Sequence, residues 1–445
     1  MGTNLNMLIA WTAAIFLLPL CTVAKTWVSL PVHAPARIED DAPFGHQVDV
    51  AIGTPPQNSS FNIGIQDWLV APLVPQCIFC PVDGMYDPNW STSFKVSDKR
   101  KGSFDLGGLE GNETFTLGGV LQDLNTPMIF IDQMGPEAAK RFSGGILGLA
   151  PTKNESLRGH NILVRLDEQG QLLNPVWGLR LGGDNPRLTI GALDPNEYEG
   201  ELNWVPELND TGMIKVDAYR GYQGNILPFQ YPVTASLSSV SKNIYLPEIM
   251  TYLTNESLIG PQEGVNLEPD HKQQIGIQCN GTQPPQLQFS VDINGINYPI
   301  NQHDLIRPPS IMAAKGFCNI GVYKADPAGF ELGVVFLRSV YLAYRFPTGD
   351  CPGYYGFAFP KGSTTTSNQK PRDAPPNASQ CLSLVQPTST PTPTIAVHEG
   401  KLGFSEEKFR VYGKAEDQWV ALRGVGDLPA LTVRGVEDKS VVNGG

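Results

Sequence analysis

The chain has 445 residues, 44 acidic and 32 basic side chains, and a formal net charge of −12. Apolar residues make up 41% and charged residues 17%, which supplies material for large cores and excludes a highly charged disordered chain. The net negative charge argues against nucleic acid as a partner. The 46 glycines and 38 prolines predict many turns between short strands rather than long helices.

The N-terminus has the pattern of a secretory signal peptide. Met7 to Leu20 is an apolar run, too short for a comfortable membrane span, and the small residues Thr22-Val23-Ala24 follow it. We therefore expect cleavage after Ala24, with residues 1–24 as the signal and residues 25–43 as a short pro-segment or N-terminal extension. An uncleaved anchor is the alternative. No later run reaches the length of a spanning helix, so no membrane span is expected after signal removal.

The cysteines and the glycosylation triplets support an extracellular compartment. Removal of the signal leaves an even set of six, which in a secreted chain predicts three disulfides: Cys77, Cys80, Cys279, Cys318, Cys351 and Cys381. The Cys77–Cys80 pair could instead belong to a zinc or redox site, but no second such pair accompanies it, and an oxidising context favours a structural loop. Asn-x-Ser/Thr triplets predict a glycosylated surface at Asn58, Asn89, Asn112, Asn154, Asn209, Asn255, Asn280 and Asn377.

The region between Phe44 and Pro360 is predicted to be mostly β. Short runs of Val, Ile, Leu, Phe and Tyr alternate with turn residues, and the clearest strands are Gln47–Ile52, Met128–Ile131, Arg187–Ile190, Leu287–Ile293 and Val340–Arg345. Two helices are predicted, at Asn161–Gln169 and Pro247–Thr254. Residues 362–397 are rich in Ser, Thr and Pro, which predicts an extended stalk. Residues 398–445 are charged and poor in aromatics, which predicts a disordered tail.

Several motifs occur in a fixed order along this β-rich region. Ile52-Gly53-Thr54-Pro55-Pro56-Gln57 follows a predicted strand, Phe142-Ser143-Gly144-Gly145-Ile146-Leu147-Gly148-Leu149 lies further on, and Glu331-Leu332-Gly333-Val334-Val335-Phe336-Leu337-Arg338-Ser339 echoes it in the second half. Tyr86-Asp87-Pro88, the segment from Leu188 to Pro195 and the segment from Phe289 to Pro299 complete the set. Together they resemble the pepsin-like, A1-type aspartic proteases over about Phe44 to Pro360.

The resemblance implies an all-β, bilobal acid protease fold with a cleft between two lobes, an N-terminal lobe of residues 44–205 and a C-terminal lobe of residues 206–361. It also implies one catalytic Asp from each lobe, supported by Ile146-Leu147-Gly148 and Glu331-Leu332-Gly333. Two adjacent carboxylates share one proton, so that one activates a water while the other donates to the peptide carbonyl. The implied disulfides are Cys77–Cys80 and Cys279–Cys318, which leaves Cys351 with Cys381.

The chain departs from the family at both catalytic positions. In one register Asn62 replaces the first Asp, with Gly64 in place of the loop glycine; the ungapped register places Gly64 at the catalytic position itself. Asp67 is the only nearby acid and is interpreted as a loop residue. Ser238 replaces the second Asp. Other candidate residues of the cleft are Phe104 and Asp105 of the flap region, together with Ser239, Ser241 and Lys242 of the second loop.

These departures predict a secreted, catalytically inactive member of the family that keeps the cleft as a binding surface. No cofactor or metal is expected, because the histidines show no ligand spacing. An extended peptide or protein suits a cleft between β lobes, cell-wall material is a further candidate, and a monomer is expected. Three alternatives remain: an active secreted endopeptidase with a misaligned dyad, a Ser238–Lys242 nucleophile, and an inhibitor-like or wall-associated structural role.

Overall fold

The computed structural model describes most of the predicted body. It covers residues 25–33, 45–81, 84–102, 106–139, 142, 144–150, 158–208, 212–247, 268–269, 274–278, 287–307, 317–324, 329–363 and 369–388. Outside these ranges lie the predicted signal peptide, the tail 398–445, all but the first residue of the helix Pro247–Thr254, and the site residues Phe104, Asp105, Cys279, Asn154, Asn209, Asn255 and Asn280.

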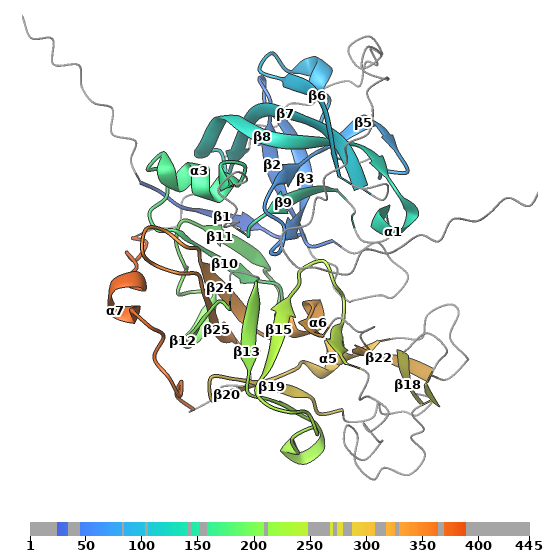
Figure 1. The fold of residues 1–445 in the computed structure, drawn as a ribbon, viewed down its shortest axis with the longest axis vertical. Coiled ribbons are helices and arrows are strands. Elements are labelled where there is room, and N and C mark those ends of the chain that lie inside the picture. The colour runs from blue at the N-terminus through green and yellow to red at the C-terminus, as the bar shows by residue number, and fades with distance from the viewer. Residues whose placement is uncertain are drawn as a thin grey trace, which may run out of the picture.

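The N lobe is built on one eight-stranded sheet, shown at the top of Figure 1. Its strands, in spatial order, are β5 (Leu73–Ile78), β8 (Leu121–Met134), β4 (Val70–Ala71), β9 (Gly145–Gly148), β3 (Gln57–Gly64), β2 (Gln47–Ile52), β7 (Leu106–Leu117) and β6 (Lys95–Gly102). In β2 the even-numbered residues Val48, Val50 and Ile52 are buried, as the period of two predicts for a strand with one face on the core.

The C lobe contains a second eight-stranded sheet and a small three-stranded one. The larger sheet consists of β13 (Met213–Val216), β15 (Val233–Leu237), β23 (Phe330–Leu332), β16 (Ile244–Leu246), β22 (Phe317–Lys324), β18 (Gln274–Gln278) and β17 (Glu268–Pro269), with β21 (Ile306–Arg307) paired to β22. The smaller sheet consists of β14 (Ala218–Arg220), β19 (Ser290–Ile293) and β20 (Ile296–Pro299).

A six-stranded sheet joins the lobes and lies between them in Figure 1. Its order is β1 (Val28–Pro31), β11 (Arg187–Ile190), β10 (Val176–Arg180), β24 (Tyr341–Arg345), β25 (Tyr354–Pro360) and β12 (Tyr198–Pro206). The β10–β24 pair joins the two halves of the chain directly. One large apolar cluster runs through both lobes and this sheet, so the two-lobed body shares a continuous core.

The helices of the described ranges are few and short. They are α1 (Pro136–Ala139), α3 (Ile162–Glu168), α5 (Gln302–Leu305), α6 (Val334–Leu337) and α7 (Ala378–Cys381), with the 3₁₀ turns η1 (Pro88–Trp90) and η2 (Tyr222–Gly224). The predicted helix Asn161–Gln169 is α3 with its two caps: the Asn161 side chain accepts from the backbone N–H groups of Leu163 and Val164. Within the described ranges, no helix has both the length and the apolar character needed to cross a membrane.

Described residues at both ends of the body pack against it. Residues 28–31 of the expected N-terminal extension form β1, whose buried Val28 and Leu30 pack into the main core. Residues 369–388, which we call the C-terminal strap, pack on the body instead of extending from it. The side chain of Asn174 bonds both backbone polar groups of Val385, at 2.8 Å each.

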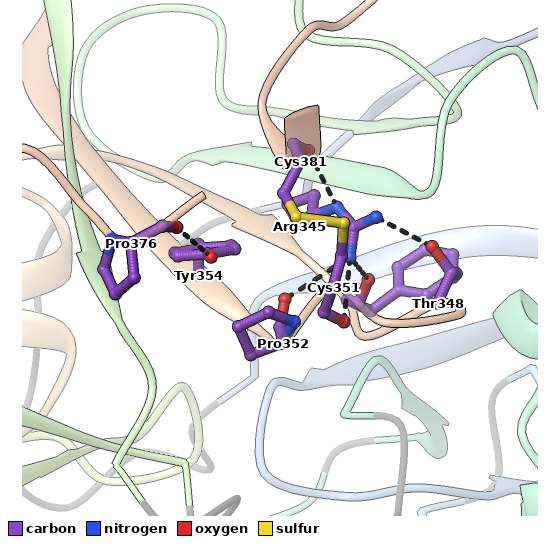
Figure 2. Close-up of a disulfide and its surroundings, with 8 residues drawn as sticks. Arg345, Thr348, Cys351, Pro352, Tyr354, Pro376 and Cys381 are labelled. Atoms are coloured by element: carbon purple, nitrogen blue, oxygen red, sulfur yellow. Dashed lines mark hydrogen bonds between the residues drawn. A yellow bond between two sulfur atoms is a disulfide. The ribbon is translucent and has the colours of Figure 1, made fainter. Parts of the chain in front are cut away.

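A buried arginine and a disulfide fasten the strap (Figure 2). Cys351 is bonded to Cys381 at the end of α7, and the Arg345 guanidinium donates to the Cys381 carbonyl at 3.1 Å and to the Thr348 hydroxyl at 2.7 Å. Composition alone misses this docking, because side chains from outside the segment, including Asn174, Arg345 and Cys351, create it. The implied disulfide Cys77–Cys80 is also present, and Cys318 is disulfide-bonded as well.

Candidate functional site

The N-lobe part of the site is the loop that follows β3. Strand β3 runs parallel to β9, with Ile63 opposite Leu147 and Gly64 opposite Gly148. The N–H of Gly148 donates to the Leu69 carbonyl at 2.9 Å, so the loop from Gly64 to Leu69 closes over this glycine. We call residues 64–69 the N-axis loop.

The C-lobe part is the loop that follows β15, and it has the same backbone arrangement. Strand β15 runs parallel to β23, with Leu237 opposite Leu332, and the Ser238 N–H donates to the Leu332 carbonyl at 3.1 Å. The N–H of Gly333 donates to the Asn243 carbonyl at 3.0 Å. We call residues 238–243 the C-axis loop.

The two loops can be superposed residue by residue through their supporting segments. Leu147-Gly148 and Leu332-Gly333 occupy equivalent places, so Gly64 corresponds to Ser238. The hydrogen bonds of the two glycines give the same equivalence. Their acceptors, Leu69 and Asn243, each lie five residues after Gly64 and Ser238 respectively. Of the two registers that the sequence leaves open, the strand pairing favours the ungapped one, with Gly64 opposite Ser238.

Asn62 lies two residues before this position, and its side chain turns into the N lobe. It is 2% exposed, and its amide donates to the carbonyls of Gly144 and Gly145 at 3.0 Å each. Its equivalent in the C lobe is Ser236, within β15. The interpretation of Asn62 as the residue facing Ser238 therefore needs correction, because a residue two positions earlier in the strand is displaced by about 7 Å.

Ser239 joins the two loops across the lobe junction. Its hydroxyl donates to the Ile63 carbonyl and accepts from the Ile65 N–H at 3.0 Å, so it bridges the two residues that flank Gly64. Ser239 is 3% exposed, which makes these bonds costly to lose. The equivalent N-lobe residue is Ile65, whose apolar side chain cannot return such a bond.

The carboxylate of Asp67 fills the space next to the bare Cα of Gly64. A Cβ built on Gly64 would overlap the Asp67 carboxylate, whose nearest atom is Oδ2. A turn creates this proximity, because the Asp67 N–H donates to the Gly64 carbonyl at 3.2 Å. Asp67 is half-buried and corresponds to Ser241 in the C lobe. The sequence signal for this arrangement is the glycine itself, since only a residue without Cβ leaves that room.

Val240 connects the C-axis loop to a buried apolar cluster of the N lobe. It packs against a cluster that we call the N-lobe wall, which consists of Trp68, Leu69, Ala71, Leu73, Ile129, Ile131, Met134, Ala138, Phe142 and Ile146. The carbonyls of the next two residues, Ser241 and Lys242, accept from Val334 at 2.8 Å and from Val335 at 3.1 Å. The side chains of both residues are half-buried. The junction therefore brings hydroxyls, a carboxylate and an ammonium together near a buried apolar cluster.

His46 lies at the base of the junction and was missed by the sequence analysis. Its carbonyl accepts from the Ile63 N–H at 2.9 Å, and its side chain is 1% exposed. Burial, together with the positive charge of Arg338 in the C lobe, lowers the pKa of His46 to about 3. The alternation in β2 could have revealed this residue, because position 46 has the same parity as the buried Val48, Val50 and Ile52.

The comparisons with known proteins agree with this architecture. A family model described as eukaryotic aspartyl protease matches residues 46–349. Chymosin of Callithrix jacchus is 24% identical over 307 residues, covering 66% of this chain and 76% of the relative. Gastricsin of Cavia porcellus is 25% identical over 360 residues, covering 72% and 82%. Pepsin B of Canis lupus familiaris is 23% identical over 333 residues, covering 66% and 77%.

Proposed function

Because the chain belongs to the eukaryotic aspartyl protease family, we propose that it uses the two-lobed scaffold to bind an extended peptide or protein segment without cleaving it. The observation that carries the proposal is the pair of equivalent positions at the junction, Gly64 and Ser238, neither of which has a carboxyl group. The scaffold around them is intact, since both loops close over their glycines and Ser239 joins them.

Peptide hydrolysis on this scaffold needs two carboxyl groups about 3 Å apart that share one proton. Gly64 has no side chain, and the hydroxyl of Ser238 is neither an acid nor a base near neutral pH. Removing one member of a hydrolytic set in another protease class costs roughly 10⁴–10⁶ in rate. By that analogy, losing both carboxyls removes at least about 5–8 kcal/mol of transition-state stabilisation.

One observation favours the alternative of an active endopeptidase. The Asp67 carboxylate occupies the space beside Gly64, so one acid stands close to the place that the family's first Asp would fill. A single carboxylate could orient a water, but nothing on the C-axis loop from Ser238 to Asn243 could hold the shared proton. We therefore assign Asp67 to ligand binding, as an acceptor for a donor or cationic group of the peptide.

The groups at the junction suit an extended chain with alternating side chains. A peptide in a strand-like conformation presents its N–H and C=O groups to hydroxyls and charged side chains, and its side chains alternate between two faces. The Asp67 carboxylate and the hydroxyl of Ser241 can bond the backbone, while the half-buried Val240 can contact an apolar side chain of the peptide. Cell-wall material remains a second ligand class for the same test.

The decisive experiment combines cleavage and binding. The purified protein should leave denatured substrate proteins intact at acid and neutral pH, while labelled extended peptides with a Lys or Arg residue bind and give a saturable anisotropy signal. Asp67→Asn should weaken that binding by about tenfold, the worth of one charge-assisted hydrogen bond. Asp184→Asn, at an exposed position, is the matched control. Cleavage that the family's general inhibitor abolishes would refute the proposal and support the alternative.

We also propose that the protein is secreted and glycosylated. The apolar N-terminal run, the disulfides and the eight triplets support this. Among the described triplets, Asn377 is exposed on the C-terminal strap, whereas the side-chain oxygens of Asn58 and Asn89 are buried. Glycopeptide mapping of the protein from culture medium should therefore find a glycan at Asn377 most readily. A protein retained in cells without glycans would contradict the assignment.

A further inference from the structure

The loop between Cys77 and Cys80 presents two large apolar side chains to solvent. Ile78 is 60% exposed and Phe79 is 75% exposed, although both follow the buried start of β5. The disulfide closes this four-residue loop, and Phe79 has a φ of 63°, in the left-handed region that L-residues seldom adopt. The backbone therefore holds the two side chains outward, in an orientation that Phe79 would not favour in a free chain.

A basic strand, β6, ends at the same end of the N lobe. Strand β6 carries Lys95, Lys99 and Lys101, and no described carboxylate forms an ion pair with any of these three lysines. Arg100 is paired with Asp132 at 2.5 Å, and Asp98 is the one acid within the strand. In a chain of net charge −12, this strand is a local positive surface.

The strand register places the apolar loop and the basic strand together. Gly102 of β6 pairs with Gly107 of β7, Gly107 pairs with Gln133 of β8, and Gln133 pairs with Ile78 of β5. These residues form one row across four neighbouring strands, so Gly102 and Ile78 are separated by three strand spacings, about 14 Å. Lys101 and the Ile78–Phe79 tip therefore lie at one end of the N lobe.

We propose that this end of the N lobe docks on an anionic lipid bilayer, with Ile78 and Phe79 inserted at the interface and Lys99 and Lys101 against the headgroups. Two protruding apolar side chains fit the roughly 5–10 Å depth of the interfacial layer. They are too few for a stable protein interface, which buries roughly 800 Å² on each partner. The rigid loop reduces the ordering cost of insertion. At physiological salt, charges more than about 8 Å from the surface are screened, so the acidic remainder of the protein does not prevent docking through this face.

Vesicle co-sedimentation of the full secreted protein tests the inference. We expect binding to phosphatidylcholine vesicles that contain about one third phosphatidylserine, and little binding to phosphatidylcholine alone. Phe79→Ser should lower the partition coefficient by at least about tenfold, because most of a phenylalanine ring loses its apolar environment. Each of Lys99→Gln and Lys101→Gln should lower it by about fivefold on anionic vesicles.

Matched controls separate insertion from general stickiness or misfolding. Leu124→Ser removes a side chain that is 70% exposed on β8, about 30 Å along the strand from Gln133, and should change nothing. Lys370→Gln is the charge control, at an exposed position of the strap. Phe79→Trp should keep binding and show a blue-shifted emission component when vesicles are added.

Three results would overturn the inference. The first is that the protein does not bind anionic vesicles, and the second is that Phe79→Ser leaves vesicle binding unchanged. The third is self-association that depends on Phe79 and occurs without vesicle binding, which would assign the tip to a second copy of the chain. Because the tip lies outside the residues assigned to peptide binding, loss of vesicle binding and loss of peptide binding are separate readouts.

Discussion

The N-axis loop and the C-axis loop have the same backbone arrangement but different side chains. Each follows a strand that runs parallel to its supporting strand, and each closes over a glycine, Gly148 in one lobe and Gly333 in the other. At the equivalent positions the N lobe has Gly64 and the C lobe has Ser238.

The difference shows which part of the junction the fold itself requires. A Cβ on Gly148 would meet backbone atoms of Asp67 and Leu69, and a Cβ on Gly333 would meet those of Ser241 and Asn243. Packing therefore demands the two glycines. Nothing in the backbone pairing demands a carboxyl group at position 64 or 238, so the backbone arrangement of the two loops does not depend on one.

Acidification should have the largest effect on the stability of the protein, through the buried His46 at the junction. The pKa of His46 is lowered from 6.5 to about 3 by burial and by Arg338, which is itself ion-paired with Asp304 at 2.9 Å. The unfolded chain binds a proton at His46 below pH 6.5, while the folded chain does not until about pH 3. Above pH 6.5, keeping His46 neutral in the folded protein therefore costs no free energy of unfolding. As the pH falls below 6.5, the free energy of unfolding decreases, by at most about 5 kcal/mol near pH 3.

Urea unfolding at a series of pH values checks this prediction. His46→Gln should lose less stability than the wild type on acidification, with a difference of about 3 kcal/mol at pH 4. Lys370→Gln, at an exposed position of the strap, is the control and should follow the wild type. If the free energy of unfolding falls equally with pH in the wild type and in His46→Gln, His46 is not the cause of the loss of stability in acid.

The supporting glycines provide a direct comparison of the two lobes. Gly148→Ala and Gly333→Ala should each destabilise the protein by about 3 kcal/mol or more, because the added methyl group meets backbone atoms that cannot move aside. Gly159→Ala, where a Cβ would have no neighbour within 4 Å, should change stability by less than about 0.5 kcal/mol. A large effect in only one lobe, measured by thermal and urea unfolding, would argue against the equivalence of the two loops.

Position 64 can be tested with a double-mutant cycle. Gly64→Asp should cost about 2 kcal/mol, because its side chain overlaps the Asp67 carboxylate and places a second negative charge beside it. Adding Asp67→Ser, which copies the residue at the equivalent position 241, should recover about 1–2 kcal/mol of that loss. Additive effects in urea unfolding would mean that the two side chains do not compete for one space.

The hydroxyl that bridges the lobes should give the smallest effect. Ser239→Ala leaves the Ile63 carbonyl and the Ile65 N–H without their partner at a buried position, which costs about 1–2 kcal/mol. Ser239→Thr keeps the hydroxyl and should stay within about 1 kcal/mol of the wild type. Hydrogen exchange at the Ile65 amide provides the local readout, and unchanged protection in Ser239→Ala would contradict the assignment.

Local patterns predicted the elements that depend on local causes. The bounds of Gln47–Ile52 and Arg187–Ile190 match β2 and β11, because alternating apolar residues between turn residues suffice for a strand. Asn161 predicted the start of α3, because its side chain caps the helix from within the same segment. Residues 369–388 could not be predicted in this way, because Arg345 and Cys351, far away in sequence, hold them against the body.

The sequence by itself determined the family, the β-rich class and the lack of a carboxyl group at Ser238, because these follow from residue identities in a fixed order. Tertiary structure decided which N-lobe residue is equivalent to Ser238. Sequence spacing alone allowed Asn62 or Gly64, and the pairing of β3 with β9 favours Gly64. It also brought the Asp67 carboxylate into the space that Gly64 leaves open, since a turn of the backbone, rather than a motif, sets that distance.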